Sequence, residues 1–113
     1  MPHRHQAVLE QANAAIVRGD FDGFLAFCTE DTEWTFVGEQ TLRGKGAVRE
    51  WMVATYLEPP KLKVDRMIAD GDHLAALGEV SVTDASGEAT TSAYCDVWSF
   101  RDGLLDTLRA YVV

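Results

Sequence analysis

The sequence SAYCDVWSF, residues 92–100, predicts a strand on which both the fold and the function depend. Successive side chains of a strand point to opposite faces, so alternate residues share a face. One face of this strand should therefore carry Tyr94, Asp96, Trp98 and Phe100. Because burying an unpaired carboxylate costs several kcal/mol, Asp96 must face solvent, find partners, or occupy a cavity that tunes its protonation.

Strand patterns continue on both sides of this stretch. From Lys61 onward, strands alternate with turns at a spacing typical of antiparallel hairpins. These turns are expected at residues 70–72, 84–87 and 101–103. Two shorter strands are predicted at residues 33–37 and 41–43, the first of them after a turn at residues 29–31.

Three helices are predicted in the first half of the chain. The first spans residues 5–17, where apolar residues recur at helical spacing. The second runs from an N-cap at Asp20 through Cys28. The third follows Gly46 and ends before Pro59, because proline cannot continue a helix.

This order of elements predicts an α+β protein. Three N-terminal helices would pack on a strongly curved, mostly antiparallel sheet, forming a cone-shaped α+β barrel. At 113 residues the chain is long enough for one domain, residues 1–113, with a core of its own. A curved sheet covered by helices is expected to leave a cone-shaped pocket between the two layers.

Charge and hydropathy restrict the partners and the location. The formal net charge is -8, with 10 basic and 18 acidic residues, and the basic residues are scattered. Nucleic-acid surfaces need clustered Lys and Arg, so neither nucleic acid nor an anionic membrane is an expected partner. The N-terminal stretch lacks the apolar segment of a signal peptide, and no stretch is long enough to span a membrane. A cytoplasmic location is therefore expected.

Motifs for metal or cofactor chemistry were not found in the sequence. The two cysteines, Cys28 and Cys95, are too few for a disulfide framework and lack zinc-site spacing. No glycine-rich phosphate loop, Gly-x-Ser-x-Gly elbow or zinc signature occurs. The sequence therefore predicts no cofactor and no metal, and both cysteines are interpreted as small buried apolar residues.

Five stretches together resemble the nuclear transport factor 2-like superfamily, in particular its SnoaL-like and ketosteroid-isomerase-like members. They are RGDFDGF at 18–24, EDTEW at 30–34, LRGKGAV at 42–48, DVWSFRDGLL at 96–105 and LRAY at 108–111. The resemblance implies a single SnoaL-like domain, a hydrophobic small-molecule ligand and a homodimer. It does not imply one reaction, because the superfamily includes isomerases, cyclases, hydrolases and non-catalytic binders.

Comparison with ketosteroid isomerase gives one residue of this chain a catalytic counterpart and shows that two other catalytic residues are replaced. In that enzyme a carboxylate base moves a proton while a tyrosine and a protonated aspartate stabilise the enolate oxygen. Asp96 corresponds to the protonated aspartate. Ala12 stands where the tyrosine would be and Phe36 where the base would be, and neither can transfer a proton. The resemblance therefore does not imply a true ketosteroid isomerase.

Glu79 is the candidate replacement for the missing base. Aligning the hairpin through Gly87 puts Glu79 on the cavity side near Asp96, with the small apolar face of residues 74–82 outside or against a second subunit. Two carboxylates in a poorly solvated pocket would give one raised pKa, and so an acid beside a base. The alternatives are that Glu79 lies on a solvated face, or that a one-residue bulge reverses the parity.

The candidate site thus combines two catalytic carboxylates with aromatic side chains. Asp96 and Glu79 are the predicted catalytic residues, and the predicted substrate-binding residues are Trp34, Phe36, Trp51, Tyr56, Tyr94 and Trp98. Such a pocket suits a flat or cyclic hydrophobic molecule, although ordinary core filling also explains aromatic residues. Two hypotheses follow: a cofactor-independent isomerase, cyclase or hydrolase, or a non-catalytic binding or dimeric scaffold protein of the same fold.

Overall fold

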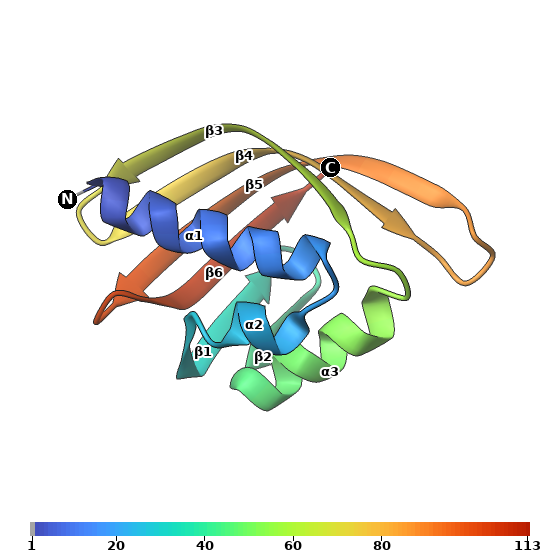
Figure 1. Cartoon of the computed structure of the whole chain (residues 1–113), viewed down its shortest axis with the longest axis horizontal. Helices are drawn as coiled ribbons and strands as arrows, with labels where there is room; N and C mark the ends of the chain where they lie inside the picture. The colour runs from blue at the N-terminus through green and yellow to red at the C-terminus, as the bar shows by residue number, and fades with distance from the viewer. Residues whose placement is uncertain (1) are drawn as a thin grey trace.

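The computed structural model describes residues 2–113 and consists of three helices on one face of a six-stranded sheet (Figure 1). The helices are α1 (Pro2–Val17), α2 (Phe21–Leu25) and α3 (Lys45–Thr55). The strands are β1 (Cys28–Phe36), β2 (Gln40–Arg43), β3 (Lys61–Asp70), β4 (His73–Thr83), β5 (Ala89–Arg101) and β6 (Leu104–Val112). The α+β class and the three-helix arrangement are therefore confirmed.

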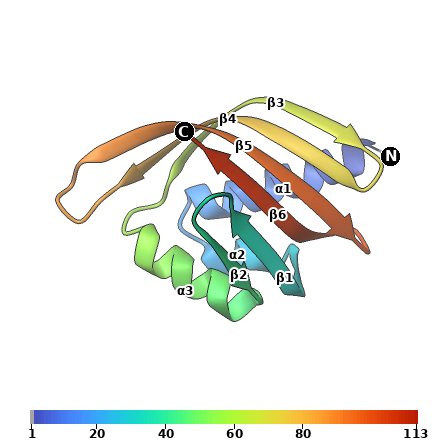
Figure 2. The same cartoon turned by 180° about the vertical axis from the view of Figure 1, so that it is seen from behind.

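The sheet is curved but open. Its strand order is β2-β1-β6-β5-β4-β3, so β2 and β3 are edges and the barrel is not closed. Strands β1 and β6 pair in parallel, and the remaining neighbours are antiparallel. Seen from behind, α1 and α2 lie beyond the sheet and α3 stands beside β2, so the outer face of the sheet is toward the viewer (Figure 2).

The second helix is shorter than its sequence pattern predicts. Asp20 caps it as expected, accepting a hydrogen bond from the Gly23 backbone at 2.8 Å. The helix ends at Leu25, however, and the expected turn at residues 29–31 lies within β1. Pairing with β6 overrides the local pattern here, since Thr29 Oγ1 donates to the Asp106 carboxylate at 2.8 Å.

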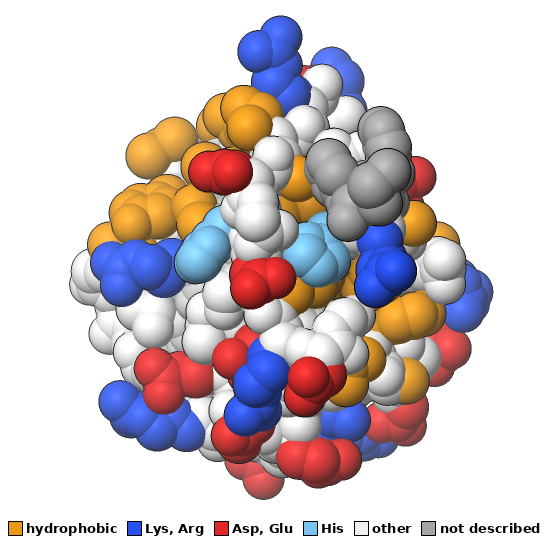
Figure 3. All heavy atoms as spheres, turned by 90° about the vertical axis from the view of Figure 1, so that its left-hand side faces the viewer, with side chains coloured by type: hydrophobic (Ala, Val, Ile, Leu, Met, Phe, Trp, Pro, Cys, Tyr) orange, Lys and Arg blue, Asp and Glu red, His pale blue; other side chains and the backbone are white. Residues whose placement is uncertain are grey.

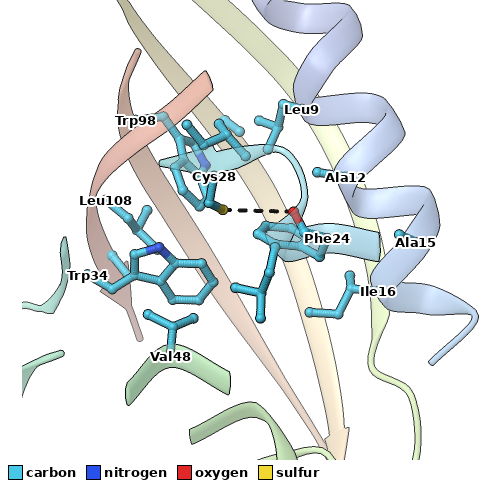
Figure 4. Packing of buried hydrophobic residues seen from close by; sticks show 14 of the residues in the cluster. Leu9, Ala12, Ala15, Ile16, Phe24, Cys28, Trp34, Val48, Trp98 and Leu108 are labelled. Carbon is cyan, nitrogen blue, oxygen red and sulfur yellow. Dashed lines mark hydrogen bonds between the residues drawn. The ribbon is translucent and has the colours of Figure 1, made fainter. Parts of the chain in front are cut away.

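The core forms where α1 and α2 meet the sheet. Figure 4 shows Ala12 and Ala15 pointing from α1 toward Phe24, and their exposed fractions are only 0% and 1%. Such small side chains allow the helix axis to approach the layer beneath it closely. Cys28 is buried in the same cluster, as predicted, with its thiol 3.8 Å from the Phe24 carbonyl oxygen.

The surface carries dispersed charges. Figure 3 shows one end of the molecule, where Lys and Arg side chains stand apart among acidic ones on the visible surface. Several charges are paired, as in the contact of Arg49 with Asp22 at 2.9 Å. Exposed pairs of this kind contribute about 0–1 kcal/mol each. None of the described helices has the length and apolar character needed to cross a membrane.

The β4–β5 hairpin has a different register from the one expected. Thr83 pairs with Ala89, so the loop comprises residues 84–88 rather than 84–87. Asp84 holds this longer loop by accepting hydrogen bonds from the backbone of Ser86 and Glu88, at 2.8 and 3.0 Å. One additional loop residue exchanges the faces of one strand relative to the other. Odd-numbered residues of β4 therefore stand opposite odd-numbered residues of β5, and even-numbered opposite even-numbered.

Gly78 allows β3 to lie close to β4 beside a bulge in β3. The register of β3 shifts between Val64 and Arg66, and a Cβ atom at Gly78 would lie only 1.9 Å from the carbonyl oxygen of Lys63. The atom that such a Cβ would meet belongs to the backbone of β3, which cannot move aside by rotation as a side chain can. Only glycine fits without displacing β3.

Replacing Gly78 by alanine should therefore destabilise the protein by roughly 1–3 kcal/mol, as overpacking usually does. The matched control is Gly46→Ala, because Gly46 lies in α3 with no atom within 4 Å of the added Cβ. That control should be neutral or stabilising by up to about 1 kcal/mol. Urea unfolding of both variants measures the difference, and equal stabilities would contradict the close approach.

Candidate functional site

A cavity of about 300 Å³ lies between the helices and the inner face of the sheet. It is bounded by Ile16 of α1, by Trp51 of α3 and by strands β4, β5 and β6. Most of its wall is apolar. Pockets of this size and character are where proteins hold small organic molecules.

Aromatic rings in mutual contact form one wall of the cavity. The Phe36 and Trp51 ring centroids are 4.7 Å apart, and Trp51 meets Tyr56 edge to face at 5.2 Å. Trp34 likewise meets Trp98 edge to face at 5.5 Å. Such contacts stabilise the core and also keep the wall rigid. These five side chains line the cavity, so they serve both as core and as cavity surface.

Asp96 points into the cavity from the middle of β5. Its direct neighbours are Ala76 on β4 and Ala110 on β6, neither of which can hydrogen-bond through its side chain. Within residues 2–113, no hydrogen bond or ion pair to the Asp96 carboxyl is found. Burial in this apolar setting raises the pKa of Asp96 from 3.8 to about 7. A carboxyl of this kind exists in both protonation states near neutral pH.

Two tyrosines share the cavity with Asp96. Burial, and then the negative charge of Asp96, raise the pKa of Tyr94 to about 12, and Asp65 adds a smaller contribution. The pKa of Tyr56 is raised further above its ordinary value, again by burial first and Asp96 second. Both hydroxyls therefore remain protonated and can donate hydrogen bonds toward a molecule in the cavity.

Glu79 does not belong to this site. It is exposed and pairs with Ala93, whose side chain is on the face of β5 opposite to Asp96. The predicted coupled pair of carboxylates is therefore wrong, because the longer hairpin loop shifts the parity by one residue. The same shift turns Leu74, Ala76 and Val80 inward, so the apolar face expected outside covers the core and cavity.

Some residues of the cavity wall were missed by the sequence analysis. Thr90 and Ser92 line it, and their parity with Asp96 along β5 was a usable signal. Asn13 and Glu39 also line it, from α1 and from the turn between β1 and β2. Nothing in the local sequence marks these two, because they reach the cavity only through tertiary packing.

The thiol of Cys28 lies outside the cavity wall. Burial raises the pKa of Cys28 to about 12, so its thiol stays protonated and unreactive. The indole Nε1 of Trp34 is buried and has no hydrogen-bond partner in the described chain. Across the same residues, no group of three His, Cys, Asp or Glu side chains could hold a metal ion.

The family follows from the sequence and agrees with this geometry. The chain belongs to the SnoaL-like domain family, whose model matches residues 9–106. The expected resemblance is thus confirmed over most of the chain. Among curated proteins, none matches this sequence.

Solved structures share the fold at low sequence identity. An LEH-like epoxide hydrolase of M. tuberculosis is 20% identical, with a TM-score of 0.86 over 99% of this chain and 84% of its own. A putative polyketide cyclase of Xanthomonas campestris pv. campestris is 22% identical, with a TM-score of 0.84 over 97% and 90%. TerC, crystallised with polyporic acid, is 22% identical, with a TM-score of 0.84 over 97% and 92%. These likenesses establish the cone fold, and their different activities leave the reaction open.

Replacing Asp96 by asparagine should make the protein more stable at pH 8 and leave its stability at pH 4 nearly unchanged. The unfolded chain loses the Asp96 proton near pH 4, whereas the folded chain keeps it until about pH 7. Stability of the wild type is therefore lost across this interval, by at most roughly 4 kcal/mol. Thermal unfolding at both pH values measures the effect.

The control for this experiment is Asp84→Asn, which should behave in the opposite way. Hydrogen bonds from Ser86 and Glu88 lower the pKa of Asp84, so its charged form stabilises the fold. That variant should be less stable than the wild type at pH 8. The difference should disappear as the pH falls below 4, because Asp84 of the wild type is then protonated. If the stabilities of the two variants, each relative to the wild type, changed with pH in the same direction, the opposite pKa shifts of Asp96 and Asp84 would be contradicted.

Proposed function

We propose that this protein is a cofactor-independent enzyme that moves a proton on a flat, hydrophobic small molecule. Asp96 would be the catalytic acid and base, in an isomerisation, cyclisation or hydrolysis. The observation that carries this proposal is the partly buried carboxyl of Asp96 in an aromatic cavity, where desolvation raises its pKa to about 7. A group with this pKa can accept and return a proton at neutral pH.

The surroundings of Asp96 support a role in proton transfer. Ala76 and Ala110 flank the carboxyl with apolar side chains that reduce its hydration, and a partly desolvated carboxylate is a stronger base than one in water. Trp51 and Phe36 would hold the flat face of the substrate. Tyr56 would orient a substrate oxygen, since its hydroxyl remains protonated. The activities named for the structural relatives are compatible with such a site.

A direct test uses 5-nitrobenzisoxazole, a flat aromatic probe that reacts with a buried base. The base removes the proton at C3, the C–H electrons form a nitrile, the N–O bond breaks, and the coloured 2-cyano-4-nitrophenolate is released. We expect the rate to rise with pH, with a midpoint near the pKa of Asp96 at about 7. Asp96→Asn should lower kcat/KM by at least about 100-fold.

The matched control is Glu79→Gln. It removes one carboxylate from β4 on the outer face of the sheet, away from the cavity, and should leave the rate unchanged. If Asp96→Asn and Glu79→Gln react at the same rate as the wild type, Asp96 is not a catalytic base.

A non-catalytic binding protein is the second candidate, and one observation favours it. Ala12 is fully buried and Phe36 is an aromatic wall residue, so neither of the two positions where ketosteroid isomerase has its tyrosine and its base carries a group that can transfer a proton. In that case Asp96 would form one hydrogen bond with a ligand, and the ligand would dissociate without having reacted. Saturable binding of the probe without release of the coloured product would favour this candidate over the enzyme.

We also propose that the protein forms a homodimer through the outer face of the sheet. With the corrected register, this face carries Ala75 and Leu77 of β4 beside Cys95 and Val97 of β5. All four are only partly buried in the single chain. A second copy would remove this apolar surface from water.

Leu77→Lys tests this proposal, because a charge at the centre of a contact between sheets opposes association. We expect wild-type protein to have twice the mass of one chain in light scattering. The variant should have the mass of a single chain and unchanged secondary structure by circular dichroism. A monomeric wild type would contradict the dimer.

A further inference from the structure

The inward face of β5 carries a continuous row of polar side chains. Thr90, Ser92, Tyr94 and Asp96 all line the cavity, at every second position of the strand. Their burial varies along the strand: Thr90 is exposed, Ser92 and Asp96 are partly buried, and Tyr94 is only 8% exposed. We call these four residues the β5 polar row.

The strands on either side of this row provide no side-chain partners for it. On β4 the opposed residues are Val82, Val80, Gly78 and Ala76, in the same order. On β6, Val112 stands opposite Tyr94 and Ala110 opposite Asp96. The row is therefore a polar line with apolar neighbours on both sides.

The hydroxyls of the row also lack hydrogen bonds. Across residues 2–113, no side-chain hydrogen bond is found for Thr90, Ser92 or Tyr94. The hydroxyls on the outer face of the same sheet behave differently, since Thr91 bonds Ser81 at 2.7 Å. Polar groups that are mostly buried usually have a partner. Tyr94 is only 8% exposed and lines the cavity, and its hydroxyl is not enclosed by protein, so it is accessible to a molecule in the cavity.

The spacing of the row defines the shape of a matching ligand. A strand rises about 3.3 Å per residue, so neighbouring members of the row are about 6.6 Å apart. From Ser92 to Asp96 the row extends about 13 Å. The aromatic wall that includes Phe36 and Trp51 also lines the cavity and can stack against a flat skeleton.

We propose that the β5 polar row is a binding subsite for an elongated, flat, apolar molecule with carbonyl or hydroxyl oxygens along one edge. Ser92 and Tyr94 would hydrogen-bond these oxygens, and Thr90 would contact the end nearest the solvent. The reacting part of the molecule would lie at Asp96. This last point rests on the proposed function, whereas the binding of oxygen substituents does not.

Two probes with the same skeleton test the subsite: flavone, and 4′,7-dihydroxyflavone, which adds oxygens at both ends. Their dissociation constants can be measured by quenching of tryptophan fluorescence. A hydrogen bond typically improves affinity by a few-fold to about tenfold. We expect wild-type protein to bind the dihydroxy compound at least about fivefold more tightly than flavone.

Ser92→Ala and Tyr94→Phe should each reduce this preference, and the double variant should abolish it. Both changes remove only a hydroxyl from a position that tolerates the smaller side chain. Thr91→Val is the matched control, because it removes a hydroxyl from the same strand on the outer face. The control should keep the preference of the wild type.

The possible outcomes separate this inference from the proposed function. Equal affinity of wild-type protein for both flavones, or a preference that survives in the double variant, overturns the subsite even if Asp96 catalyses elimination of the benzisoxazole. A preference that requires Ser92 and Tyr94 supports the subsite even if that elimination is absent. Loss of the preference in Thr91→Val would also overturn it, since the effect would then not depend on the inward face.

Discussion

The register between β4 and β5 is the constraint on which the cavity depends. Because residues 84–88 form the loop, Asp96 stands opposite Ala76 and faces the helices. A loop shorter by one residue would bring Glu79 to the inner face and turn Ala76 outward. The hydrogen bonds at Asp84, although exposed, hold the loop length that makes Asp96 and not Glu79 face the cavity.

The position of the cavity follows from the uneven size of the side chains beneath the helices. Along α1, alanines at positions 12 and 15 let the helix lie close to α2 and the sheet. Around α3 the contacts are made by large rings, since Trp51 packs against Phe36 of the sheet at 4.7 Å and meets Tyr56 edge to face. Small side chains thus bring the layers together beneath α1, and large aromatic side chains line the cavity beside α3.

The architecture was largely predictable, because it depends on periodic patterns and on turns. Alternation along residues 92–100 correctly placed Tyr94, Asp96 and Trp98 on one face, and the family resemblance agreed with the three helices. The location of Glu79 was not predictable in the same way, because parity across a hairpin depends on the exact loop length. Asp84-Ala85-Ser86-Gly87 reads as a complete turn, and nothing in the pattern shows that Glu88 belongs to it.

Because β1 pairs with β6, this part of the sheet cannot form until β6 is available. Trp34 and Phe36 lie beside Leu108 and Ala110, so one wall of the cavity comes from the N-terminal half and its neighbour from the final strand. Contacts between such distant parts of a chain form late and slow the folding reaction. During synthesis, the helices and β1 leave the ribosome before the strand that completes their sheet exists. Their apolar faces, including the two tryptophans that flank Phe36 in space, remain uncovered until β6 has been synthesised, and this interval is when the chain most needs protection from aggregation.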